Sequence, residues 1–183
     1  MVDILIVGKD GQVGTELQRS LASLGSVYGV GRREADLTQL TELQQTLERL
    51  QPKIIVNAAA YTAVDRAESE PELAELINVD AVRVMANYAK QHQALLVHYS
   101  TDYVFDGLQS TAYTETDHTK PKSVYGMTKL QGEQAIAEAQ CQAIVFRTSW
   151  VFAAHSNNFL RTMMRLAMQR DQLTVVNDQV GAP

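Results

Sequence analysis

Short apolar runs alternate along this chain with longer stretches in which apolar residues recur at helical spacing. The runs are rich in β-branched residues, which predicts strands at 2–7, 27–30, 53–57, 94–100, 143–147 and 173–176. The longer stretches predict helices at 13–23, 41–50, 72–91, 123–139 and 158–170. This alternation is typical of βαβ units, so we expect an α/β fold with a doubly wound parallel sheet.

One long segment departs from the alternation. Residues 105–123 lack periodicity and are rich in polar and turn residues, which predicts a surface loop between a strand and the next helix. No repeat or Gly/Ser/Pro-rich linker divides the chain. We therefore expect one domain over residues 1–183.

Composition narrows the classes of function. The chain has 183 residues, 45% of them hydrophobic, and a formal net charge of -5, which disfavours nucleic acid and anionic membranes as partners. Its single cysteine, Cys141, excludes an internal disulfide and any multi-thiolate metal site, and the four histidines show no ligand spacing. Asp3 and Gly8 bound a very short apolar run, so no signal peptide or membrane span is expected. A cytoplasmic protein without a bound metal is predicted.

A glycine-rich turn follows the first predicted strand. Gly8, Gly11 and Gly14 form a G-x-x-G-x-x-G pattern that leads into a helix. Glycine at these positions permits a tight turn, close approach of a pyrophosphate and tight helix packing, and the helix N-terminus attracts negative charge. Glycines can also serve backbone freedom alone, but this position after an N-terminal strand favours dinucleotide binding.

The end of the second predicted strand indicates which dinucleotide is bound. An acid usually stands there in NAD-binding proteins, whereas this chain has Arg32 and Arg33, which suit a 2′-phosphate. NADPH is therefore the expected cofactor, although NADH remains possible. Alternatively, Arg32 and Arg33 are solvated surface residues that bind no cofactor. Asp36 and Leu37 follow where the adenine would lie.

A tyrosine and a lysine four residues apart suggest proton chemistry. Tyr125 and Lys129 share one face of the predicted helix, and an ammonium beside a phenol would lower the pKa of the phenol. Thr101 stands at the carboxyl end of the fourth predicted strand, the edge at which parallel sheets bind ligands.

Together these motifs resemble the extended short-chain dehydrogenase/reductases, and within them the dTDP-4-dehydrorhamnose reductases. The resemblance runs from end to end and rests on GKDGQVGTELQ (8–18), NAAAYTAVDRAESEPELAELIN (57–78), HYSTDYVFDG (98–107), VYGMTKLQGE (124–133), FRTSWVF (146–152) and VVNDQVGAP (175–183).

The resemblance implies a role for particular residues. The catalytic residues would be Thr101, Tyr125 and Lys129. The cofactor would contact Gly8, Gly11, Gln12, Val13, Gly14, Arg32, Asp36, Leu37, Ala60, Tyr61, Thr62 and Tyr99, together with Tyr125 and Lys129. The sugar nucleotide would contact Val64, Thr101, Asp102, Tyr103 and Trp150, although Trp150 could equally be a core aromatic.

The implied reaction is NADPH-dependent reduction of the C4 ketone of dTDP-4-dehydro-L-rhamnose to dTDP-L-rhamnose. The resemblance also allows a homodimer and Mg²⁺ at an interface. The chain stops at Pro183, inside a segment through which family members continue, so we expect a Rossmann-type domain with only part of the substrate site and with reduced turnover.

Two other functions remain to be weighed. A sugar-nucleotide dehydratase typically has Thr-Asp-Glu at the strand end, whereas this chain has Tyr103 in place of the glutamate, which disfavours elimination. A non-catalytic NADP-binding regulator resembling the methionine adenosyltransferase β subunit is the alternative. The intact Thr101, Tyr125 and Lys129 favour the enzyme.

Overall fold

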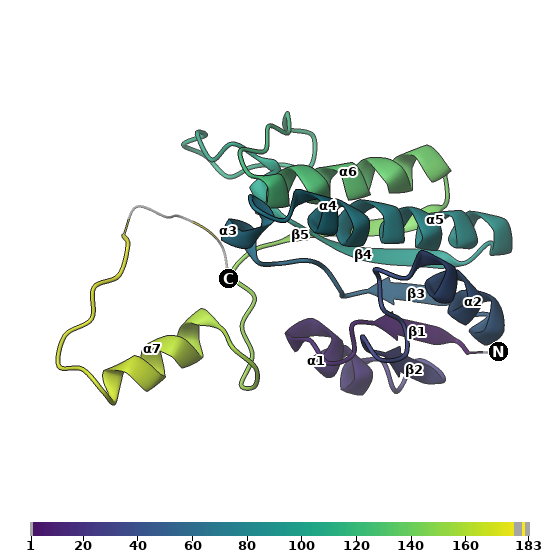
Figure 1. Cartoon of the computed structure of the whole chain (residues 1–183), viewed down its shortest axis with the longest axis horizontal. Helices are drawn as coiled ribbons and strands as arrows, with labels where there is room; N and C mark the ends of the chain where they lie inside the picture. Colours follow the sequence, from purple (N-terminus) through teal and green to yellow (C-terminus); the bar gives the residue numbers. More distant parts are fainter. Residues whose placement is uncertain (1, 178–180, 182–183) are drawn as a thin grey trace.

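A computed structural model describes residues 2–177 and 181 of the chain. Five parallel strands form one sheet in the order β2-β1-β3-β4-β5 (Figure 1). Their bounds are Ile4–Val7 (β1), Val27–Val30 (β2), Ile54–Asn57 (β3), Leu95–Thr101 (β4) and Gln142–Thr148 (β5). The predicted doubly wound parallel sheet is confirmed.

Helices connect the strands and cover the sheet. They are Gln12–Ser20 (α1), Leu40–Leu50 (α2), Val64–Ala67 (α3), Pro71–Glu75 (α4), Ala81–His92 (α5), Val124–Ala139 (α6) and Phe159–Ala167 (α7), with a 3₁₀ turn at Asp102–Val104 (η2). Residues 105–123 contain no helix or strand, as predicted. No helix in the described part of the chain is long and apolar enough to cross a membrane.

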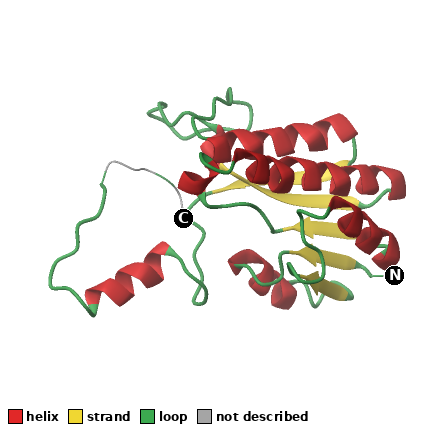
Figure 2. Ribbon diagram, in the orientation of Figure 1, coloured by secondary structure: helices red, strands yellow, loops and turns green. Residues whose placement is uncertain are grey.

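The alternation of side chains along β1 explains the two layers. Leu5 and Val7 belong to the larger core with residues of α2, α5 and α6, whereas Ile4 and Ile6 form a second core with Leu17 of α1. Figure 2 shows α2, α5 and α6 lying along the sheet. Because both faces are covered, β1 is apolar at every position and fully buried.

The predicted helix at 72–91 is wrong in one respect, because it is interrupted. A π-helical turn, Leu76–Asp80 (η1), separates α4 from α5. Asn78 lies in this wide turn with 1% of its surface exposed, and its side-chain amide bonds the backbone N–H and C=O of Tyr61 at 2.9 and 3.2 Å. This tertiary contact coincides with the widened turn, which hydrophobic spacing cannot reveal.

The predicted strand at 173–176 is also wrong. These residues form neither strand nor helix and are exposed, and β5, the edge strand nearest in sequence, pairs only with β4 in the described residues. A β-branched run becomes a strand only when a partner supplies the hydrogen bonds of its backbone.

Candidate active site

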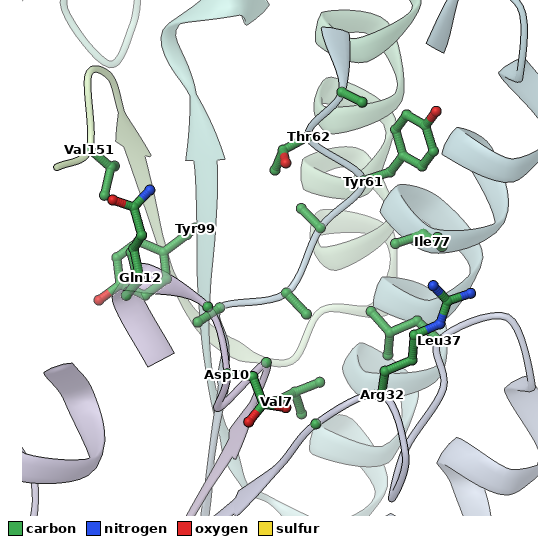
Figure 3. Close-up of a pocket in the computed structure, with 18 of the residues that line it drawn as sticks. Val7, Asp10, Gln12, Arg32, Leu37, Tyr61, Thr62, Ile77, Tyr99 and Val151 are labelled. Carbon is green, nitrogen blue, oxygen red and sulfur yellow. The ribbon is translucent and has the colours of Figure 1, made fainter. Parts of the chain in front are cut away.

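A cleft of about 720 Å³ lies at the carboxyl edge of the sheet (Figure 3). The register of the parallel strands aligns Val7 with Val30 on one side and with Asn57 on the other, so the loops after β1, β2 and β3 meet there. This is the edge at which open α/β sheets bind ligands, because the strand order reverses beside β1.

The glycine turn forms the floor of the cleft at the start of α1. Gly8 has a φ of 92°, which favours glycine, and its amide donates to the carbonyl of Val30 at 2.9 Å. A Cβ on Gly14 would overlap the carbonyl oxygen of Gly8, so α1 packs directly on the turn. Gly14 therefore supports the turn and does not line the cleft.

Every other residue predicted to contact the cofactor lines this cleft. They are Gly8, Gly11, Gln12, Val13, Arg32, Asp36, Leu37, Ala60, Tyr61, Thr62, Tyr99, Tyr125 and Lys129. Figure 3 shows Arg32 and Leu37 at one end of the cleft and Gln12, Tyr99 and Val151 at the other. The lining thus brings together segments that lie more than a hundred residues apart in the sequence.

The end of the cleft at β2 carries both signs of charge. Arg32 has 83% of its side chain exposed, and its Nε donates to Oδ2 of Asp36 at 3.2 Å. The backbone N–H of Thr38 lowers the pKa of Asp36, with smaller contributions from the Thr38 hydroxyl and Arg32. The guanidinium of Arg32 is therefore held near the cleft by an ionised carboxylate and keeps most of its surface free.

Tyr125 lies in the first turn of α6, close to the end of β4. Ser123 caps this helix by accepting a hydrogen bond from the amide of Gly126 at 3.1 Å. The ring of Tyr125 packs edge-on against that of Tyr103, with centroids 5.5 Å apart. Burial raises the pKa of Tyr125, while a hydrogen bond with the Thr101 side chain acts in the opposite direction.

Lys129 lies one turn further along α6, and its side chain is directed toward the sheet. It has only 1% of its surface exposed, and its Nζ donates to the carbonyl of Tyr99 at 2.6 Å. Burial lowers the pKa of Lys129 to about 8. The expectation that Lys129 lowers the pKa of Tyr125 is not met, because burial of the phenol dominates and raises that pKa.

The residues predicted to contact the sugar nucleotide fall into separate places. Thr101 ends β4, and Asp102 and Tyr103 follow it in η2, where the Thr101 hydroxyl accepts from the amide of Tyr103 at 3.2 Å. Val64 begins α3. Trp150 is 44% exposed and packs edge-on against Phe159 of α7, with centroids 5.9 Å apart, so it is not a core aromatic. None of these residues lines the cleft itself, and their contact with substrate stays a prediction.

Some lining residues were missed in the sequence. Val151 and Ser156 follow β5. The side-chain Nδ2 of Asn158 donates to Oε1 of Gln12 at 3.0 Å, which connects this segment to α1. These residues follow the carboxyl end of a parallel strand, and this position could have predicted that they lie at the ligand-binding edge of the sheet. Arg66 and Ile77 lie within the segment 57–78 that carries the resemblance, but the sequence analysis assigned no role to either residue.

The residues that line the cleft fit a dinucleotide. The backbone of Gly11, Gln12 and Val13 lines the cleft at the N-terminus of α1, where no side chain caps the helix, so its amides suit a pyrophosphate. In the part of the chain that the structure describes, no group of three His, Cys, Asp or Glu residues could hold a metal. Asp178, Gln179 and Pro183 belong to segment 175–183, the last one that carries the family resemblance, and they lie outside the described residues.

Comparisons with known proteins agree with this arrangement. The chain is 53% identical over 180 residues to the dTDP-4-dehydrorhamnose reductase of Burkholderia thailandensis, covering 98% of this chain and 60% of that protein. It is 50% identical to the same enzyme of Salmonella typhimurium, covering 62% of that protein. The crystal structure of dTDP-4-dehydrorhamnose reductase from Bacillus anthracis in complex with NADP superposes with a TM-score of 0.95 at 38% identity, covering all of this chain and 66% of that one.

The chain thus spans about 60% of the length of the curated relatives that it matches. A family model described as the RmlD substrate binding domain matches residues 2–183, which is nearly the whole sequence. The chain therefore belongs to the RmlD substrate binding domain family.

Proposed function

We propose that the full-length protein uses NADPH to reduce the C4 ketone of dTDP-4-dehydro-L-rhamnose, which yields dTDP-L-rhamnose. In this proposal residues 1–183 form the cofactor-binding domain and one wall of the substrate site. The observation that carries the proposal is the position of Tyr125 and Lys129 in the wall of the cleft, at the edge where Thr101 ends β4.

The cofactor would lie along the carboxyl edge of the sheet. The amides of Gly11, Gln12 and Val13 would hold the pyrophosphate, and Leu37 would contact the adenine. Arg32 would pair with the 2′-phosphate, because its guanidinium is largely exposed beside the cleft. When bound, the nicotinamide supplies the hydride that is added to C4.

Tyr125 would donate the proton that the ketone oxygen takes up. A proton donor must carry its proton at neutral pH, and burial raises the pKa of this phenol, so the phenol is protonated there. Thr101, which ends β4 at the same edge of the sheet, would orient the carbonyl through its hydroxyl. Lys129 would hold the nicotinamide ribose.

Two further properties belong to the same proposal. The reaction would take place in the cytoplasm, where the free thiol of Cys141 would stay reduced. The protein would act as a homodimer, which sedimentation of the full-length protein tests.

The test is to incubate the full-length protein with dTDP-4-dehydro-L-rhamnose and NADPH and to follow the nicotinamide absorbance. We expect substrate-dependent oxidation of NADPH and formation of dTDP-L-rhamnose, identified by mass. NADPH binding without turnover would contradict the reductase proposal and favour the non-catalytic regulator. Loss of water from a 4-hydroxy sugar nucleotide would favour the dehydratase.

A further inference from the structure

Residues 105–119 form a closed loop between η2 and α6 that the proposed mechanism does not use. The amide of Lys120 donates to the carbonyl of Val104 at 2.9 Å, so the two ends of the loop lie side by side. Figure 1 shows the loop beyond the N-terminal end of α6. A compact loop whose ends meet and whose own side chains pack together is an Ω-loop, and such loops are often functional. We call residues 105–119 the Ω-loop.

Three flat side chains connect the Ω-loop to the sheet. Within the loop, the rings of Phe105 and Tyr113 stack with their centroids 4.2 Å apart and an angle of 9° between their planes. The guanidinium carbon of Arg147, on β5, lies 5.0 Å from the centroid of the Phe105 ring. The face of an aromatic ring attracts a cation, and a planar guanidinium also stacks on it. Phe105 therefore contacts both a ring of its own loop and a charged residue of the sheet.

Arg147 is held in place by a second set of contacts. Its Nε and Nη2 donate to the two carboxylate oxygens of Glu133, on α6, at 3.0 and 2.7 Å. Glu133 also accepts from the hydroxyl of Ser100, which lines the cofactor cleft. Hydrogen bonding to Glu133 raises the pKa of Arg147, and the charge of Glu115, in the Ω-loop, adds a smaller rise. A guanidinium paired through two bonds has few other orientations, so it presents a fixed face to Phe105.

Tyr113 connects the first turn of the Ω-loop to its middle. Its hydroxyl donates to Oδ1 of Asp106 at 3.0 Å and accepts from the backbone amide of Gln109 at 3.2 Å. If Phe105 left its place, Tyr113 would lose its stacking partner and the amide of Gln109 would be exposed to water. The exchange rate of this amide with solvent therefore reports whether the stack is formed.

The Ω-loop begins two residues after Tyr103, which is predicted to contact the sugar nucleotide. A Cβ on Gly126, in the first turn of α6, would lie 2.3 Å from the carbonyl oxygen of Tyr103, so η2 packs directly on that turn. The ring of Tyr103 lies edge-on to that of Tyr125, with centroids 5.5 Å apart. A displacement of Phe105 would therefore also change the position of Tyr103 beside Tyr125.

We propose that Arg147 is a positioning residue for substrate binding. By holding Phe105 it keeps the Ω-loop docked on the sheet, and the docked loop keeps Tyr103 in place beside Tyr125. The link to the substrate rests on the proposed function, in which Tyr103 contacts the sugar nucleotide. The docking itself does not depend on that function, because the contacts that produce it lie within residues 100–147.

Hydrogen exchange of the full-length protein tests the docking without substrate. In Phe105→Leu the side chain stays apolar but its flat face is lost, so the Ω-loop should open more often. The amide of Gln109 should then exchange about tenfold faster, whereas the amides of β4, which is paired on both sides, should keep their rates. In Phe105→Tyr the ring is kept, so Gln109 should exchange within about threefold of its native rate.

Two further variants identify the cause. His118→Ala, at an exposed position of the same loop, is the matched control and should leave the exchange of Gln109 unchanged. In Arg147→Lys the ammonium can still pair with Glu133 but offers no flat face, so Gln109 should again exchange faster. Because the two changes remove the same contact, Phe105→Leu should add less than about threefold to the effect of Arg147→Lys.

Four results in the exchange experiment would overturn the proposal. They are an unchanged rate for Gln109 in Phe105→Leu, an equal acceleration in Phe105→Tyr or in His118→Ala, an equal acceleration of the β4 amides, and additive effects of the two changes at Phe105 and Arg147. The third result would mean that the stack supports the whole fold, and the fourth that the two residues act independently.

Kinetics of an active full-length enzyme test the link to the substrate. In Phe105→Leu, KM for the sugar nucleotide should rise about tenfold, while the calorimetric dissociation constant of NADPH stays within about twofold. Phe105→Tyr should restore the native KM. An unchanged KM, or an equal loss of NADPH affinity, would contradict the positioning role. If the reductase assay itself fails, the exchange measurements still decide whether Arg147 docks the Ω-loop, so the two failures are distinguishable.

Discussion

In the proposed function Tyr125 is the proton donor, and its phenol is buried near Thr101. Burial raises the pKa of the phenol, so the phenol carries its proton at neutral pH, while the Thr101 side chain acts in the opposite direction. Removal of the hydroxyl should therefore affect the chemical step far more than the binding of the cofactor.

We expect Tyr125→Phe to lower kcat of the full-length enzyme by about 10²-fold or more, while NADPH affinity changes little. The ring and its edge-on contact with Tyr103 are kept in this variant. Steady-state kinetics and calorimetry measure the two effects. Tyr28→Phe, a change on the edge strand β2, serves as a control that should leave both unchanged. A near-native kcat in Tyr125→Phe would contradict the proposed role.

Arg32 should determine the preference for NADPH over NADH. A charge-assisted contact with the 2′-phosphate contributes about 1.5–3 kcal/mol, so Arg32→Ala should weaken NADPH binding by roughly tenfold or more. NADH affinity should stay the same or improve, because Asp36 loses its partner and can accept from the ribose hydroxyls. Calorimetric titration of both cofactors measures this, with Arg49→Ala at the exposed end of α2 as the control. Equal losses for both cofactors would refute the assignment.

The buried amine of Lys129 should make stability depend on pH in the alkaline range. Its pKa is about 8 in the folded chain and 10.5 in its ordinary state, so between these values the unfolded chain binds more protons and stability rises with pH. The cost of burying the ammonium is about 3 kcal/mol below pH 8, and it is relieved as the amine loses its proton.

The measurement is urea unfolding of the native chain and of Lys129→Met across this range. Relative to the variant, the native chain should gain about 2 kcal/mol between about pH 8 and pH 9.5. Met keeps the length of the side chain without the titrating group. Parallel curves for the two proteins would show that Lys129 does not titrate in this window.

At the scale of elements, the turn between β1 and α1 has two separable tasks. Gly14 lets the helix pack on the turn, because any Cβ there would overlap the carbonyl oxygen of Gly8. Gly11 lines the cleft, and a Cβ there would lie 3.4 Å from the same oxygen, an ordinary contact. Stability and cofactor binding should therefore respond differently to alanine at the two positions.

Gly14→Ala should lower the free energy of unfolding by about 1–3 kcal/mol, as overpacking of a core does. Gly11→Ala should change it by less than about 0.5 kcal/mol but should weaken NADPH binding, because the methyl group would stand where the pyrophosphate approaches. Chemical denaturation and calorimetry of both variants measure these effects. Equal losses of stability would contradict this division of tasks.

At the scale of the whole molecule, several large apolar side chains of β5 and of the segment after it are exposed in the described chain. Phe146 on β5 is 47% exposed, and Met168 after α7 is 84% exposed. None of the residues of α7 is buried, and the helix lies away from the sheet (Figure 1). The cofactor cleft is lined by residues from Val7 to Ser156.

We therefore expect the 183-residue chain to bind NADPH but to reduce the sugar nucleotide orders of magnitude more slowly than the full-length protein. Stabilisation of the transition state requires walls that hold the sugar against the nicotinamide, and the predicted substrate residues supply one wall only. Parallel assays of the two proteins, with calorimetry for NADPH, measure this. Comparable kcat/KM values would show that the substrate site is complete within residues 1–183.

Much of the fold and cofactor site follows from the sequence, because the responsible patterns are local. Apolar runs and helical spacing predicted five of the strands and the parallel sheet, and the glycine turn needed only its place after β1. Parallel strands bring their carboxyl ends to one edge, so Arg32, Tyr125 and Lys129 could be assigned to one cleft.

Only the tertiary structure decided the features that depend on partners distant in sequence. The π turn coincides with the bonds of Asn78 to Tyr61, and the run at 173–176 has no strand beside it. The spacing of Tyr125 and Lys129 predicted a lowered pKa for the phenol, but burial raised it and lowered that of Lys129. The charge and direction of a buried group are set by solvent exclusion and by its hydrogen-bond partners, and neither is encoded in the spacing of residues along the chain.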